Sequence, residues 1–92
     1  MTGIETVRVR VTGRVQGVAY RAWIRDEARR LALSGWVRNE PDGAVSALLS
    51  GAPAAVERML AAMREGPPAA EVRDVTAEPS GERPPTGFAI RR

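Results

Sequence analysis

Residues 13–21, which read GRVQGVAYR, separate two segments with different hydrophobic patterns. Residues 6–12 before this stretch alternate between apolar and polar side chains, whereas residues 20–33 repeat apolar side chains at helical spacing. A strand that turns through glycines into a helix gathers backbone N–H groups that have no partner inside the helix. The arginine at the end of the stretch adds a guanidinium. We therefore expect residues 13–21 to form a loop able to bind an anion.

The flanking segments predict a strand and a helix. Valine occupies every second position from residue 7 to residue 11, which is typical of a half-buried strand over residues 6–12. Apolar side chains then recur every third or fourth residue, at Tyr20, Ile24, Ala28 and Leu31. Ser34 and Gly35 follow this helix, and we expect the glycine to end it in a left-handed conformation.

The rest of the chain predicts a second β-α-β half. Residues 35–50 read as a hairpin around the turn EPDG at 40–43, and Pro53 opens a helix that ends at Gly66. An irregular strand over 70–78, with a bulge or at an edge, leads through a proline-rich loop to a last strand at 88–91. This order predicts an α+β, ferredoxin-like (split β-α-β) sandwich: an antiparallel or mixed sheet of four to five strands with two helices on one face.

The composition limits the chemistry. We expect the 92 residues, 1–92, to form a single domain. The chain has no cysteine, histidine or lysine, and all 14 of its basic residues are arginine. Thiol nucleophiles, Ser–His pairs, Schiff-base lysines and Cys/His zinc sites are therefore excluded. The formal charge of +3 favours anions, either phosphorylated small molecules or nucleic acid.

The sequence also predicts where the protein resides. Its apolar runs are far shorter than a membrane span, and its N-terminus lacks the basic-then-apolar pattern of a secretory signal. The absence of cysteine fits a reducing compartment. We expect a cytoplasmic monomer with no membrane association.

Two sets of residues are candidates for a site. The first is the loop with its arginine, Arg21: the loop residues are Val15, Gln16, Gly17, Val18 and Ala19. The second is Asn39, whose amide can both donate to and accept from a water molecule. The alternatives are a plain strand–helix connection with a solvated arginine, and an ordinary turn residue.

Two stretches resemble the signature motifs of the acylphosphatase family. Residues 11–21, VTGRVQGVAYR, resemble the first motif. Residues 35–39, GWVRN, followed by Gly43, Val45 and Gly51, resemble the second. The motifs are long, separate and in the family's order, and the resemblance covers nearly the whole chain.

The resemblance implies an enzyme that hydrolyses the carboxyl–phosphate bond of a small-molecule acyl phosphate. The backbone amides from Val15 to Ala19 would cradle the phosphate, Arg21 would bind its oxygens, and Asn39 would position the attacking water. The resemblance also implies no metal or organic cofactor, with the proton of the water passing to the substrate's own phosphate. An acyl phosphate is an activated anhydride, so positioning and charge stabilisation can suffice.

The chain departs from the family pattern at three positions. Tyr20 replaces the usual phenylalanine, and its hydroxyl needs a partner or water. Ser46 stands where relatives often have an acidic residue. Glu40 follows Asn39 and brings a negative charge near the site. None of the three removes a proposed catalytic group.

Two other interpretations differ in class. One is a module of the same fold that binds RNA or a phosphorylated ligand without turnover; with 4% aromatic residues, the sheet offers few rings for bases, so we expect no nucleic acid partner. The other is a domain excised from a larger carbamoyl-transfer maturation protein. We expect a stand-alone protein, because such proteins continue into cysteine-rich segments.

Overall fold

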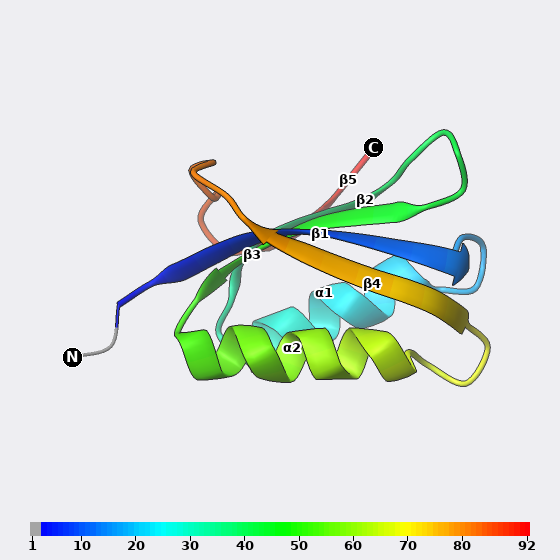
Figure 1. The fold of residues 1–92 in the computed structure, drawn as a ribbon, viewed down its shortest axis with the longest axis horizontal. Coiled ribbons are helices and arrows are strands. Elements are labelled where there is room, and N and C mark those ends of the chain that lie inside the picture. Colours follow the sequence, from blue (N-terminus) through cyan, green and yellow to red (C-terminus); the bar gives the residue numbers. More distant parts are fainter. Residues whose placement is uncertain (1–2) are drawn as a thin grey trace.

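A five-stranded sheet with two helices on one of its faces makes up the computed structural model, which describes residues 3–92 (Figure 1). The elements are, in chain order, β1 (Glu5–Arg14), α1 (Tyr20–Arg30), β2 (Ser34–Asn39), β3 (Val45–Gly51), α2 (Pro53–Glu65), β4 (Glu71–Pro79) and β5 (Phe88–Arg91). The strand order is β4-β1-β3-β2-β5. Every neighbouring pair is antiparallel except β2 with β5. The predicted split β-α-β arrangement is confirmed, with the extra strand at the edge beside β2.

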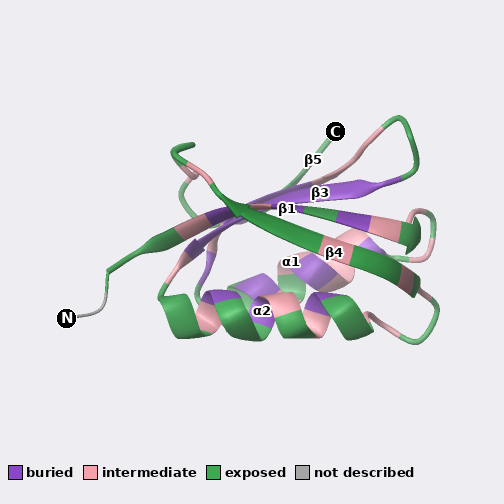
Figure 2. Ribbon diagram, viewed as in Figure 1, coloured by how far each residue is buried: buried purple, intermediate pink, exposed green. Residues whose placement is uncertain are grey.

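The core lies between the sheet and the helices. The three valines of β1 pair with Leu49, Ala47 and Val45 of β3, so both central strands turn an apolar row toward the helices. Each helix packs a row of buried side chains against the sheet (Figure 2): Ile24 and Ala28 from α1, and Val56, Met59 and Met63 from α2. The alternation in the sequence therefore follows burial, as expected for a sheet covered on one side. No helix in the described part of the chain is long and apolar enough to cross a membrane.

The other face of the sheet is covered by arginines. Trp36 of β2 lies on this face, yet only 1% of its surface is exposed. The guanidiniums of Arg8, Arg38 and Arg91 lie 4.9, 4.8 and 5.0 Å from the centre of its ring. The indole N–H donates to Glu82 in the loop between β4 and β5 at 3.0 Å. Cation–π contacts and one hydrogen bond thus bury a large aromatic ring where no helix covers it.

The end of α1 differs from the prediction. The helix stops at Arg30, and the left-handed residue behind it is Ala32, with φ of 58°, whereas Gly35 lies inside β2. The Leu33 N–H donates to the Ala28 carbonyl at 2.9 Å, and the Ala32 N–H donates to the Arg29 carbonyl at 3.1 Å. This closing pattern satisfies the last carbonyls and turns Leu33 into the core. Burial of Leu33 outweighs the cost of a left-handed alanine, about 1–2 kcal/mol, and the local sequence did not reveal this tertiary contact.

The edge strand β4 is irregular, as predicted. Its register with β1 shifts between Thr12 and Gly13, which marks a bulge. Gly13 has φ of 124°, and a Cβ there would lie 2.2 Å from the Glu71 carbonyl oxygen. Only glycine fits this position, so the first glycine of the GRVQGVAYR stretch serves the close approach of β1 and β4.

Candidate active site

The β1–α1 loop, residues 15–19, is fixed at both ends by the core. Val15 and Tyr20 are each 1% exposed. Between them, φ is positive at Gly17 (74°) and at Ala19 (62°) but not at Gln16 or Val18. Alternation of this kind turns successive backbone N–H groups toward one side and forms a concave anion-binding nest. The predicted loop therefore has the backbone form that anion binding requires.

The N–H groups of this loop are available. Among residues 3–92, no partner accepts a hydrogen bond from the N–H groups of residues 15–19. Ala19 caps α1 without a side-chain hydrogen bond, and the first turn carries no acidic residue. The partial positive charge at the start of α1 thus adds to the open donors.

Arg21 lies in the first turn of α1 beside the loop. It lines a hollow of about 160 Å³ together with Val15, Gly17, Ala19, Tyr20, Ala22 and Ile90. Arg25 and Arg30 of the same helix form ion pairs with Asp26 and Glu27. Arg21 forms no ion pair within the described residues. Its guanidinium is therefore free to bind an anion in the hollow.

Asn39 ends β2 at the same end of the sheet as the loop (Figure 1). It pairs with Val45, so its side chain lies on the helix-covered face, diagonal to Ile90 of the neighbouring strand β5. Its Oδ1 atom is buried and has no donor within residues 3–92. A buried acceptor without a donor costs about 1–3 kcal/mol. Such an oxygen is well suited to accept a hydrogen bond from a water molecule.

Gln16 joins the loop to the hairpin that carries Asn39. Its Nε2 group donates to the carbonyl oxygens of Glu40 and Ala44, each at 2.8 Å. Sequence reasoning assigns Gln16 only a backbone role and misses this side-chain contact. The available signal was a long amide among small and apolar residues, but its partners are 24 and 28 positions away in the chain.

The three departures from the family pattern have local explanations. The Tyr20 hydroxyl donates to the Met63 carbonyl oxygen at 2.9 Å, which supplies the expected partner, and burial raises the pKa of this phenol. The Glu40 carboxylate accepts from Arg38 Nε at 2.8 Å. The Arg38 guanidinium, and after it the Ser46 hydroxyl, lower the pKa of Glu40. The negative charge that the sequence placed near the site is therefore paired with a neighbouring arginine.

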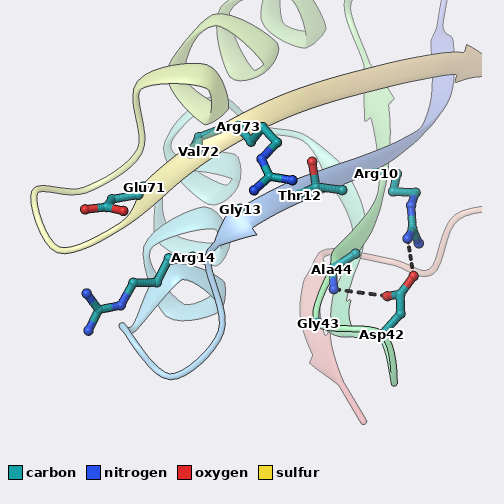
Figure 3. Close-up of a pocket in the computed structure, with 10 residues that line it drawn as sticks. All are labelled: Arg10, Thr12, Gly13, Arg14, Asp42, Gly43, Ala44, Glu71, Val72 and Arg73. Atoms are coloured by element: carbon teal, nitrogen blue, oxygen red, sulfur yellow. Dashed lines mark hydrogen bonds and ion pairs between the residues drawn. The ribbon is translucent and has the colours of Figure 1, made fainter.

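A larger groove of about 540 Å³ lies beside the hairpin turn and does not contain Arg21. Asn39 lines neither this groove nor the smaller hollow. The ends of β1 and β4 form one side of it and residues 42–44 form the other (Figure 3). Arg10 points toward Asp42, which also accepts the Ala44 N–H at 3.1 Å. The groove holds three arginines and two acidic side chains, so its charge is mixed. The smaller hollow, with open N–H groups and an unpaired arginine, is the better anion site. Within the described residues, no three histidine, cysteine or acidic side chains cluster as metal ligands.

Comparison with known proteins identifies the family of the chain. The family model described as Acylphosphatase matches residues 7–90. The chain is 56% identical over 85 residues to an acylphosphatase of Rhizobium meliloti (strain 1021), a match that covers 91% of this chain and 90% of the relative. The structure of an acylphosphatase from Coxiella burnetii superposes with a TM-score of 0.91 at 33% identity and covers 96% of this chain and 93% of that one. The Bacillus subtilis acylphosphatase gives a TM-score of 0.90 at 33% identity, with 98% and 100% covered. As the two sequence motifs predicted, the chain belongs to the acylphosphatase family.

Proposed function

We propose that residues 15–19 and Arg21 hold the phosphoryl group of an acyl phosphate while Asn39 orients the water that attacks it. The activity, hydrolysis of a small-molecule acyl phosphate by an enzyme of the hydrolase class, follows from the family to which the chain belongs. The assignment of these residues to the reaction is our proposal, and the geometry of the loop supports it.

The phosphoryl group binds where positive charge is concentrated. Open N–H groups of the loop, the start of α1 and the unpaired guanidinium of Arg21 meet around one hollow. Charge-assisted hydrogen bonds to phosphoryl oxygens are about twice as strong as neutral ones, and an arginine can make two of them. These donors are in place before the reaction, so they stabilise the charge that spreads over the phosphoryl oxygens in the transition state. This convergence of open donors is the observation that carries the proposal.

Asn39 directs the water. Its buried Oδ1 accepts a hydrogen bond from the water and turns the oxygen lone pair of the water toward phosphorus. The bond between this oxygen and phosphorus forms, the bond from phosphorus to the acyl oxygen breaks, and the acyl group leaves as a carboxylate. The proton of the water passes to a phosphoryl oxygen, giving inorganic phosphate. The chain has no histidine, cysteine or lysine to act as the base, and a leaving carboxylate is stable enough to need no general acid.

We further propose a cytoplasmic monomer, with residues 1–92 as one domain, that works without cofactor or nucleic acid partner. Within the described surface, Ile4 and Ile90 are the exposed large hydrophobic residues, which is too little for a stable dimer interface. RNA binding on such a sheet uses exposed aromatic rings, and Trp36 is covered by arginines. Residues 1 and 2 of this domain lie outside the described residues.

The test is phosphate release from benzoyl phosphate by Asn39→Ala and by the wild-type protein. We expect kcat to fall about 100-fold, a typical loss for a polar group that acts in the transition state, while inorganic phosphate still inhibits at its wild-type concentration. Full activity of Asn39→Ala would remove the role assigned to this residue. Tight RNA binding by the wild-type protein, without phosphate release from any acyl phosphate, would support the binding-module alternative.

A further inference from the structure

We propose that the side chain of Gln16 is a positioning residue that sets the phosphate loop and Asn39 at their working distance. The inference rests on the proposed function, because it assigns a role in the same site. Gln16 itself need not touch the substrate through its side chain, since its amide is occupied by the hairpin.

The amide of Gln16 completes the hydrogen bonding of the hairpin turn. The Glu40 carbonyl already accepts the Gly43 N–H at 3.2 Å, and the Ala44 carbonyl accepts the Glu40 N–H at 2.8 Å. Gln16 adds a second hydrogen bond to each of these oxygens, at 2.8 Å in both cases. Each carbonyl oxygen has two lone pairs, and both are used. The Gln16 side chain thus binds the first and the last residue of the turn, Glu40 and Ala44, and Glu40 directly follows Asn39.

Each partner keeps its own shape without this contact. The loop is fixed by the buried residues Val15 and Tyr20 at its ends. The turn is closed by its own backbone hydrogen bonds and by the Asp42 side chain. These internal contacts do not set the distance between the loop and the turn. In the described residues, the side-chain hydrogen bonds that join the loop to the turn come from Gln16. A water held by Asn39 must meet the phosphorus atom held by the loop, so this distance governs the reaction more than it governs phosphate binding.

The chemistry of the contact is specific for an amide. Two carbonyl oxygens need two N–H donors on one atom, and the NH₂ group of glutamine provides them. An ionised glutamate at this position would face both carbonyls with oxygens, and the repulsion would push the loop and the turn apart. A protonated glutamate would restore one donor. Because hydrogen bonding to the neutral acid favours it, the pKa of such a glutamate would rise above its usual value.

The experiment compares Gln16→Ala, Gln16→Glu and a matched control, Arg29→Ala. Arg29 also forms a fork from a side chain to backbone, donating to the Phe88 carbonyl at 3.2 and 3.0 Å, but it joins α1 to β5. For each variant, kcat and KM are measured with benzoyl phosphate, together with inhibition by inorganic phosphate and the thermal midpoint of unfolding. We expect Gln16→Ala to lower kcat at least about tenfold, as a small misplacement of reacting groups can do, with KM and phosphate inhibition within about threefold. Arg29→Ala lowers the midpoint and leaves kcat unchanged.

Gln16→Glu provides the readout that a purely structural role would not move. At pH 8 it has the kcat of Gln16→Ala or less, and its kcat rises relative to Gln16→Ala as the pH falls to about 5, where the glutamate protonates. A wild-type kcat in Gln16→Ala, or equal losses of kcat in Gln16→Ala and Arg29→Ala, would overturn the inference. Failure of the proposed function looks different: Arg21→Ala and Asn39→Ala would then also keep full activity.

Discussion

The chain passes from a strand into a helix twice, and the two junctions differ. Between β3 and α2 it uses a single residue, Ala52, in an extended conformation with φ of −60° and ψ of 137°. Pro53 follows as the first helical residue and has no N–H to satisfy, and the Val56 N–H donates to the Ala52 carbonyl at 3.0 Å. Between β1 and α1 the chain uses residues 15–19, two of them left-handed. Because β1 and β3 are antiparallel, the junctions lie at opposite ends of the sheet (Figure 1).

The β3–α2 junction shows that a strand of this sheet can pass into a helix through a single residue. At the β1–α1 junction an alanine takes a left-handed conformation, which costs about 1–2 kcal/mol for an L-residue, and the N–H groups stay open. The β1–α1 junction therefore has backbone strain and unpaired N–H groups that the β3–α2 junction avoids. Such strain is typical of a binding site.

The largest effect on activity is expected from a change at Arg21, which directly follows the β1–α1 junction. Arg21→Ala should lower kcat/KM about 100- to 1000-fold, because it removes a donor to the transition state. Arg58→Ala, on the exposed side of α2 in its second turn, should change kcat/KM less than twofold. Rates of phosphate release from benzoyl phosphate measure both. Equal losses in the two variants would show that general positive charge, and not the β1–α1 junction, attracts the substrate.

A smaller effect is expected where the first residue of α1 reaches the end of α2. Tyr20→Phe removes the hydrogen bond to the Met63 carbonyl and should lower the free energy of unfolding by about 1 kcal/mol. In the wild-type protein, burial raises the pKa of Tyr20 above its ordinary value of 10.0. The folded state therefore holds its proton longer, so this contribution is complete below pH 10 and is lost as the pH rises above it. Urea unfolding between pH 8 and about pH 11 should show this alkaline loss in the wild type, and a smaller loss in Tyr20→Phe.

Relief of the strained alanine should have a similar or smaller effect. Ala19→Gly should raise the free energy of unfolding by up to about 1 kcal/mol, because glycine takes a positive φ without strain. Ala32→Gly is the matched control, since Ala32 has φ of 58° at the other end of α1. Urea unfolding measures both stabilities. If Ala19→Gly also weakens inhibition by inorganic phosphate whereas Ala32→Gly does not, the strain at Ala19 serves to keep the loop in shape for the ligand.

The smallest effect concerns acid. Hydrogen bonding from the Arg10 guanidinium, and then from the Ala44 N–H, lowers the pKa of Asp42 in the hairpin turn. A lowered pKa adds stability that is present above the ordinary value of 3.8 and disappears as the pH falls through the folded-state value. Asp42→Asn should therefore unfold with less acid dependence than the wild type below pH 4. Identical acid profiles would show that this exposed pair contributes nothing measurable.

The sequence predicted most of the fold because its signals are local. Alternating valines, Pro53 and the glycine-containing turns each act within a few residues. The predicted end of α1 was wrong, because the helix end is determined by burial of Leu33, which is a tertiary effect. The motifs assign Arg21 and Asn39 to the site, and this assignment stays a prediction. Two structural features of the site could not be predicted from the motifs. The left-handed conformation of Ala19 could not be predicted, because alanine prefers right-handed helices. The hydrogen bonds from Gln16 to residues 40 and 44 depend on how two segments distant in sequence pack together.

The groups gathered at the site have one further chemical property in common. Backbone N–H groups, a guanidinium and a carboxamide are all poor nucleophiles, and the neighbouring phenol of Tyr20 is buried, protonated and hydrogen-bonded. An acyl phosphate readily transfers its acyl group to amines and thiolates, and the chain contains no lysine or cysteine. A hollow that binds an acyl phosphate, as proposed above, can therefore concentrate a reactive acylating agent without being modified by it. After many turnovers, peptide mass spectrometry should find no acyl group on the loop residues 15–19, Arg21 or Asn39.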